Sequence, residues 1–138
     1  MLATLIQNNT SINESVTASH VLVLLPKLEK LPNKYDLLGE ETLKAFLARR
    51  QMEFSRLSET PACANLINGT LCAWVMVDLE QPIFDQQTAI RKALQLLLDE
   101  EPSSVHLAVY GNSHQRQLLA RLSVFVAWVN GAALPVRK

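Results

Sequence analysis

The chain has 138 residues, of which 49% are hydrophobic and 19% are charged, and its 13 basic residues balance its 13 acidic ones. This composition is too apolar for a disordered chain and is typical of one globular domain. The charges also balance within residues 1–69 and within residues 70–138, so the sequence lacks the basic excess that is usual in proteins that bind nucleic acid.

The N-terminal part of the chain predicts a polar lead-in followed by a buried strand. Residues 2–7 could form a first, edge-like strand, and residues 8–19 are polar. Residues 20–25 (HVLVLL) form a continuous apolar run that Pro26 closes, a pattern typical of a strand covered on both faces. We therefore divide the chain into a lead-in, residues 1–19, and a single α/β domain, residues 20–138.

The middle of the chain predicts one helix and one hairpin. Asn33 can cap a helix over residues 34–51, whose apolar positions recur every three or four residues. Residues 62–67 and 70–78 predict two strands joined by a two-residue type I′ turn at Asn68-Gly69. This register sets Cys63 opposite Trp74 and Cys72 opposite Asn65, which brings both thiols to one face in poor disulfide geometry. We expect reduced thiols, with a disulfide or redox pair as the alternative.

The C-terminal part predicts a helix, a strand and a second helix. Asp85 can cap a helix over residues 85–100, residues 104–110 predict a strand, and Ser113 can cap a helix over residues 114–130, with Gly131 following its end. The residues expected to face inward on the last helix are Leu118, Leu122, Phe125 and Val129, with Leu119 and Val126 beside them. The alternation of strands and helices predicts a three-layer α/β/α sandwich with a mixed sheet.

No catalytic, cofactor-binding or metal-binding residue can be assigned from the pattern. The four glycines are too far apart for a phosphate-binding loop. His20, His106 and His114 have no ligand partner at a metal-binding spacing, so we expect structural or surface roles. Asp99, Glu100 and Glu101 could attract a cation, but a solvated helix end is the simpler interpretation.

The large apolar side chains are interpreted first as packing residues. The residues expected to pack in the core are Trp74, Phe84, Leu94, Leu97, Phe125 and Trp128. An exposed interface role is the alternative for the two tryptophans, because tryptophan is enriched at binding hot spots. The stretch from residue 113 onward carries four basic residues and no acidic one, so it could meet an acidic partner surface; these residues are Arg116, Arg121, Arg137 and Lys138.

Several stretches together resemble a known family. They are residues 64–78 (ANLINGTLCAWVMVD), 84–85 with 90–94 (FD and IRKAL), 126–131 with 134–135 (VAWVNG and LP), and the run HVLVLL. In these packing and turn motifs the chain resembles the N-terminal domain of the leucyl (cytosol) aminopeptidase family, of the proteobacterial type.

The resemblance implies a macro-domain-like fold and a non-catalytic, structural or assembly role. Members of the family carry two divalent metal ions (zinc, manganese or magnesium) in a C-terminal catalytic domain, release N-terminal amino acids from peptides, and assemble as hexamers. Their catalytic motifs, of the type NTDAEGR, do not occur in this sequence. The expected partners are therefore the chain's own catalytic domain and further copies, and this chain alone is expected to be inactive.

A second function remains open, because the resemblance to macro domains suggests a stand-alone module that binds ADP-ribose or a nucleotide. We expect neither nucleic acid nor membrane as a partner. The sequence shows no secretory signal, and its longest apolar run, residues 118–136, is interrupted by Arg121, Asn130, Gly131 and Pro135. These features predict a cytoplasmic protein.

Overall fold

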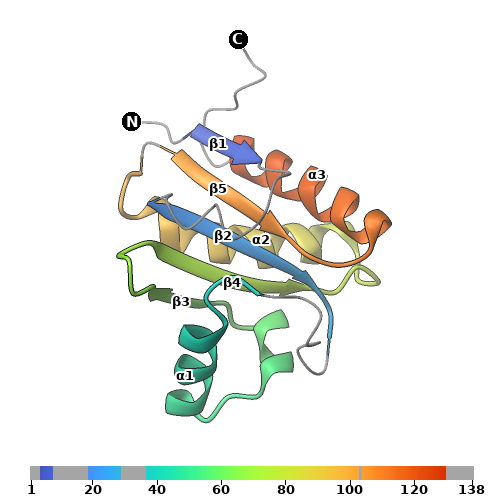
Figure 1. Ribbon diagram of the computed structural model, residues 1–138. Helices are drawn as coiled ribbons and strands as arrows, with labels where there is room; N and C mark the ends of the chain where they lie inside the picture. Colours follow the sequence, from blue (N-terminus) through green and yellow to red (C-terminus); the bar gives the residue numbers. More distant parts are fainter. Residues whose placement is uncertain (1–3, 8–18, 29–36, 103, 130–138) are drawn as a thin grey trace.

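The computed structural model describes residues 4–7, 19–28, 37–102 and 104–129, which form one mixed sheet with helices on both faces (Figure 1). The elements in chain order are β1 (Thr4–Gln7), β2 (His20–Pro26), α1 (Glu40–Arg50), the 3-10 helix η3 (Phe54–Ser58), β3 (Ala62–Asn65), β4 (Leu71–Val77), α2 (Ile83–Leu98), β5 (Ser104–Val109) and α3 (Ser113–Val129).

The sheet has five strands in the order β1-β5-β2-β4-β3. The first four strands in this order run parallel, and only β3 is antiparallel to its neighbour β4. Helices α2 and α3 cover one face, whereas α1 and η3 cover the other (Figure 1). The predicted α/β class and three-layer arrangement with a mixed sheet are confirmed.

Two hydrophobic cores lie on the two faces of the sheet, and the central strands contribute to both. On β4, Ala73 and Val75 pack toward α2 and α3, whereas Trp74 and Met76 pack toward α1 and η3. Every residue of β4 is buried, and so are residues 21–26 of β2. This explains why both strands are continuous apolar runs rather than alternating ones.

Helix α1 begins at Glu40, six residues after the predicted start. The three residues before it are not helical, and Gly39 adopts a left-handed conformation with φ of 68°. The start is set by tertiary contacts: the backbone N–H of Leu38 donates to the Tyr110 hydroxyl (2.8 Å), and the indole N–H of Trp74 donates to the Leu38 carbonyl (3.0 Å). The predicted cap, Asn33, lies outside the described residues.

The hairpin between β3 and β4 differs from the prediction by one residue in register. Its loop has three residues, because the backbone N–H of Leu66 donates to the carbonyl of Thr70 and that of Gly69 donates to the carbonyl of Leu66. Gly69 has φ of 93°, but Asn68 is not among the residues with positive φ, so a type I′ turn is excluded. This is the pattern of a type I turn followed by a glycine bulge.

The register shift separates the two cysteines. Cys63 pairs with Ala73, and Cys72 pairs with Ala64, rather than with the predicted partners Trp74 and Asn65. A shift of one residue moves side chains to the opposite face of a sheet. Cys63 therefore packs toward the α2 and α3 face and Cys72 toward the α1 face, so the predicted placement of both thiols on one face is wrong.

The remaining helices match the predictions in place but not in their caps. Helix α2 begins at Ile83, directly after Pro82, and has no side-chain capping bond, so Asp85 lies in its first turn rather than at its cap. Helix α3 is capped by Asn112 rather than Ser113. The side chain of Asn112 accepts from the backbone N–H of Gln115, and the Gln115 side chain accepts from that of Asn112, which is a capping box.

Helix α3 is rotated relative to the prediction. Its buried residues are Leu119, Ala120, Ser123, Val126 and Ala127. Phe125 and Val129, which we expected to face inward, are exposed, and Leu118 and Leu122 are half-buried. No helix in the described part of the chain is long and apolar enough to cross a membrane.

Candidate functional site

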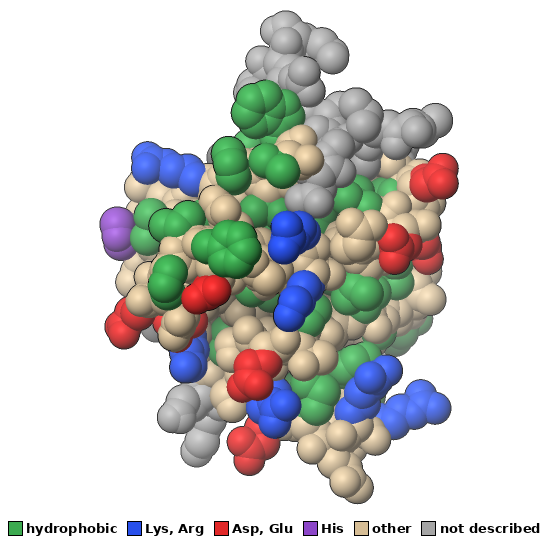
Figure 2. Space-filling model, turned by 180° about the vertical axis from the view of Figure 1, so that it is seen from behind, with side chains coloured by type: hydrophobic (Ala, Val, Ile, Leu, Met, Phe, Trp, Pro, Cys, Tyr) green, Lys and Arg blue, Asp and Glu red, His purple; other side chains and the backbone are tan. Residues whose placement is uncertain are grey.

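The outer surface of helices α2 and α3 carries a cluster of exposed apolar side chains. We define the α2–α3 patch as the following residues, with their exposed fractions: Ile83 (57%), Phe84 (69%), Phe125 (47%), Trp128 (53%) and Val129 (65%). Figure 2 shows apolar side chains gathered on this face of the molecule, with basic side chains between them. Contiguous exposed apolar patches commonly mark interaction surfaces, and aromatic residues are enriched at the residues that dominate binding energy.

The two helices contribute to the patch together. Phe84 and Arg91 of α2 line a small hollow of about 60 Å³ with Phe125 and Val129 of α3. Trp128 lies on the same helix, three residues after Phe125 and one before Val129, so the last two turns of α3 are apolar on their outer side as well as on their buried side.

The six residues predicted to pack in the core fall into two groups according to their burial. Trp74, Leu94 and Leu97 are fully buried, as predicted. Phe84, Phe125 and Trp128 are exposed, so their prediction as core residues is wrong, and the surface alternative that the sequence left open for Trp128 is the one the structure has.

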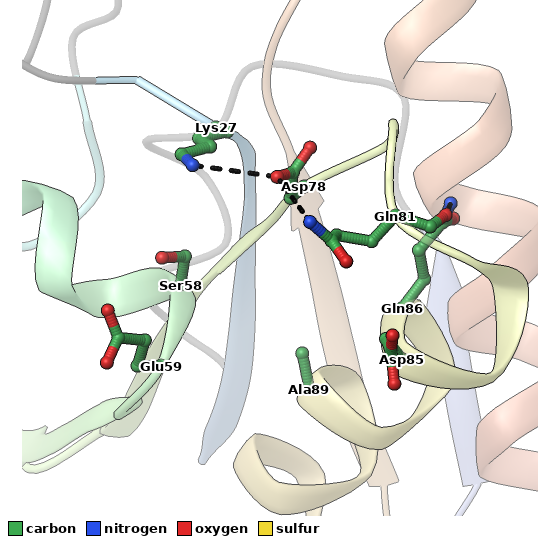
Figure 3. A pocket seen from close by; sticks show the side chains of 8 residues that line it. All are labelled: Lys27, Ser58, Glu59, Asp78, Gln81, Asp85, Gln86 and Ala89. Carbon is green, nitrogen blue, oxygen red and sulfur yellow. Dashed lines mark hydrogen bonds and ion pairs between the residues drawn. The ribbon is translucent and has the colours of Figure 1, made fainter.

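A polar pocket lies at the carboxyl ends of β2 and β4. Lys27 follows β2 and Asp78 follows β4, and the chain then leaves β2 toward α1 on one face and β4 toward α2 on the other. In open α/β sheets, ligands bind at such a switch point, where the two connections diverge and leave a crevice. We call this pocket of about 320 Å³ the switch-point pocket (Figure 3); its lining residues are Lys27, Ser58, Glu59, Asp78, Gln81, Asp85, Gln86 and Ala89.

Hydrogen bonds fix the side of the switch-point pocket that is formed by the loop after β4. The carboxylate of Asp78 accepts from the backbone N–H of Glu80 (3.0 Å), contacts the Gln81 amide (3.5 Å) and pairs with Lys27 (3.5 Å). These contacts, the backbone bond first, lower the pKa of Asp78. Gln86 is buried, and its Nε2 donates to the carbonyls of Leu79 and Gln81, which holds the loop after β4 against α2.

His20 joins the beginning of β2 to the end of α2. Its Nδ1 lies 2.8 Å from the Ser19 hydroxyl, and its Nε2 lies 2.8 Å from a carboxylate oxygen of Glu100. Sequence reasoning missed this contact because 80 residues separate His20 from Glu100. The three groups form a row of hydroxyl, imidazole and carboxylate at the amino edge of the sheet, opposite the switch-point pocket. Glu100 is exposed, so water competes for its contact with His20.

The other histidines have separate surroundings. His106 lies on β5, and burial lowers its pKa. Within the described residues its Nδ1 has no hydrogen-bond partner. His114 is exposed in the first turn of α3. The three histidines are therefore not brought together.

The three acidic residues at the end of α2 have separate local roles. Asp99 accepts from the side chain of Gln95 (2.8 Å), Glu100 pairs with His20, and Glu101 adopts a left-handed conformation with φ of 52°. Across the described ranges, no group of three or more His, Cys, Asp or Glu side chains could hold a metal ion.

Both cysteines carry free thiols. Burial raises the pKa of both, strongly for Cys72. Of the basic residues near the C-terminus, Arg116 and Arg121 are exposed on α3, whereas Arg137 and Lys138 lie outside the described residues.

Comparisons with known proteins add no family to this picture. No protein-family model matches the chain, and a search of curated protein sequences found no match.

Proposed function

We propose that this chain is the non-catalytic N-terminal domain of a leucyl aminopeptidase-like exopeptidase, with a structural and assembly role. In this proposal, a catalytic domain on the same polypeptide holds two divalent metal ions (zinc, manganese or magnesium) and releases N-terminal amino acids from peptides. The whole protein would be cytoplasmic and hexameric. The sequence resemblance and the three-layer α/β fold are compatible with this proposal.

The observation that carries the proposal is the α2–α3 patch. Phe84, Trp128 and Phe125 expose 69%, 53% and 47% of their surfaces. Smaller apolar side chains of the same two helices are completely buried; these are Ile90, Leu97 and Leu119. Each aromatic ring covers roughly 150–250 Å² when it is buried, so docking on this patch would remove much of that area from water. A domain whose task is to hold another domain needs such a surface, since fully buried interface cores are apolar and rich in aromatic residues.

The first test compares the 138-residue chain with the longer polypeptide that the proposal requires. Both are purified and assayed with a leucine chromogenic substrate in the presence of manganese. We expect no release of product by the short chain and steady release by the long one. Steady turnover by the short chain, or a gene that stops after Lys138, contradicts the proposal.

The second test addresses the patch. In the longer polypeptide, Phe84→Ser and Trp128→Ser should weaken hexamer formation, measured by sedimentation velocity, because they remove apolar area from the docking surface. Ile67→Ser is the matched control, because Ile67 is fully exposed on the hairpin loop away from the patch. Equal effects of all three changes would show that loss of an apolar residue, and not the patch, is responsible.

For the second candidate function, binding of ADP-ribose or another nucleotide, one observation is favourable and one is unfavourable. The switch-point pocket lies where α/β domains bind such ligands. Its charges, however, are three carboxylates (Glu59, Asp78 and Asp85) against one ammonium (Lys27), which repel a diphosphate. A calorimetric titration with ADP-ribose decides: sub-millimolar affinity would favour this candidate.

A further inference from the structure

The hollow within the α2–α3 patch has the size of one apolar side chain. Its volume is about 60 Å³. A single water molecule needs about 10–15 Å³ of such space, so the hollow has room for roughly four to six heavy atoms. A leucine or methionine side chain has about this number of heavy atoms. The hollow can therefore receive one such side chain from a partner.

The walls of the hollow are apolar. Phe84 of α2 and Phe125 and Val129 of α3 line it, and the buried Val126 contributes to its base. Thr88 also lines the hollow, but its hydroxyl donates to the carbonyl of Phe84 (2.9 Å), so that hydrogen is already used. A side chain that enters the hollow is held by hydrophobic contact rather than by hydrogen bonds.

The apolar area of the patch is smaller than a complete interface. Its three aromatic rings are each about half exposed and leave roughly 300 Å² in water. One partner of a standard protein–protein interface buries about 800 Å². The rest of the contact must fall on the rim of the patch, so the charges of the rim help to select the partner.

The charged groups next to the hollow are basic (Figure 2). Arg91 lines the hollow itself, and Arg121 lies one helical turn before Phe125 on the same side of α3. Neither arginine forms an ion pair within the described part of the chain. Asp85 and Lys92 line a separate pocket on the side of α2 that faces η3, where their opposite charges offset each other.

This charge argues against two occupants of the patch. A second copy that docks through the same face would set Arg91 and Arg121 against the same arginines, and like charges across an interface are unfavourable. The chain's own residues 130–138 directly follow α3, but they carry Arg137 and Lys138 and no acidic residue. The complementary occupant is a partner that brings carboxylates to an apolar contact.

We propose that the α2–α3 patch docks an amphipathic helix with an acidic rim. The helix inserts a leucine or methionine into the hollow and places carboxylates against Arg91 and Arg121. A groove between two helices suits the apolar face of a third, and arginine pairs with carboxylates through two parallel hydrogen bonds. The inference rests on the proposed function only in treating the patch as a docking surface; under that proposal the helix belongs to the catalytic domain or to another subunit.

The test is a titration of the isotope-labelled 138-residue chain with synthetic helical peptides, followed by the backbone amide signals in NMR spectra. Each peptide has about 18 residues, enough to form a helix alone. The first carries a leucine stripe flanked by glutamates, the second has alanine in place of its central leucine, and the third has lysines in place of the glutamates. We expect the first peptide to shift the signals of residues 84–91 and 125–129, with a Kd below about 1 mM that rises as sodium chloride is added. The other two should bind at least about tenfold more weakly.

Two variants with matched controls locate the site. Arg91→Gln should weaken binding of the glutamate peptide by about five- to tenfold, the loss of one charge-assisted contact. Phe84→Ser should weaken it by a similar factor, because it removes one wall of the hollow. Arg49→Gln, on the exposed surface of α1 across the sheet, and Ile67→Ser, on the hairpin loop, should leave the affinity unchanged. All four side chains are exposed, and circular dichroism spectra identical to the parent would show that the fold is intact.

Several results would overturn the proposal. They are the absence of shifts with the glutamate peptide up to about 5 mM, equal or tighter binding of the lysine peptide, and equal losses of affinity in the variants and their controls. Binding to phosphatidylserine vesicles without binding to the glutamate peptide would assign the patch to a membrane surface instead. Self-association of the chain in sedimentation velocity that Phe84→Ser abolishes would assign it to a second copy. The titration contains no peptidase substrate, so its outcome is independent of the aminopeptidase assay, and either proposal can fail alone.

Discussion

Trp74 and Trp128 stand in the same local sequence, Ala-Trp-Val, but the structure gives them opposite surroundings, and this allows a sharp prediction. Trp74 is fully buried, and its indole N–H donates to the Leu38 carbonyl (3.0 Å). Trp128 exposes 53% of its surface. Replacing each with alanine should therefore have very different effects on the free energy of unfolding.

The magnitudes follow from the buried area and from the cavity left behind. Trp74→Ala opens a cavity between β4 and α1 and leaves a carbonyl without its donor, so it should cost about 4–6 kcal/mol. Trp128→Ala removes about half as much buried area, and water can fill the space, so it should cost about 1–2 kcal/mol. The stability of the whole domain is about 5–15 kcal/mol, so Trp74→Ala could unfold the chain.

The assay has to avoid the probe that is being removed. Urea unfolding is followed by far-ultraviolet circular dichroism, because the fluorescence of the chain comes largely from these two rings. The milder variants Trp74→Phe and Trp128→Phe each leave one tryptophan for quenching with acrylamide. We expect strong quenching when only Trp128 remains and weak quenching when only Trp74 remains.

Equal losses of stability in the two alanine variants would refute the reasoning, and so would equal quenching in the two phenylalanine variants. Either result would place the ring of Trp128 inside the core, where the sequence pattern first predicted it. It would also remove the main aromatic residue of the α2–α3 patch.

Three further predictions follow from local features of the structure. Gly39→Ala should cost about 2–4 kcal/mol in urea melts, because φ is +68° and the new Cβ would lie 2.6 and 2.9 Å from side chains; Gly69→Ala, with positive φ but open space, should cost only about 1 kcal/mol. Native alkylation followed by mass spectrometry should modify half-buried Cys63 before buried Cys72, and simultaneous modification would contradict the assigned register. The lowered pKa of Asp78 stabilises the fold above the unfolded pKa, and this contribution is lost as the pH falls through the folded value. Asp78→Asn should therefore be less stable at pH 7, and the difference should shrink below about pH 4; a difference independent of pH would refute this assignment.

The sequence predicted the central strands well because their pattern permits one interpretation. The continuous apolar runs of β2 and β4 are buried on both sides, as such runs indicate. Helix α3 was harder, since apolar residues surround most of its circumference. Periodicity alone could not distinguish the buried position Leu119 from the exposed position Phe125.

The turn of the hairpin was predicted incorrectly, and the candidate site was not predicted, for other physical reasons. Asn68-Gly69 is compatible with a two-residue turn, but the chain forms a three-residue loop, and only the backbone bonds of Leu66 distinguish the two. The switch-point pocket brings together Lys27, Glu59 and Asp85, which are separated by more than twenty residues along the chain. Sheet order creates this proximity, and no local pattern contains it.

The two hydrogen bonds on Leu38 also carry a consequence for the order of folding. They connect Leu38, which lies two residues before the start of α1, to Trp74 and Tyr110, 36 and 72 positions later in the chain. Helix α1 has no side-chain capping bond of its own, and isolated helices of 11 residues are marginal in water. We therefore expect α1 to form after β4 and β5 have paired with β2, and its helical content to be absent from a peptide that contains only residues 37–51.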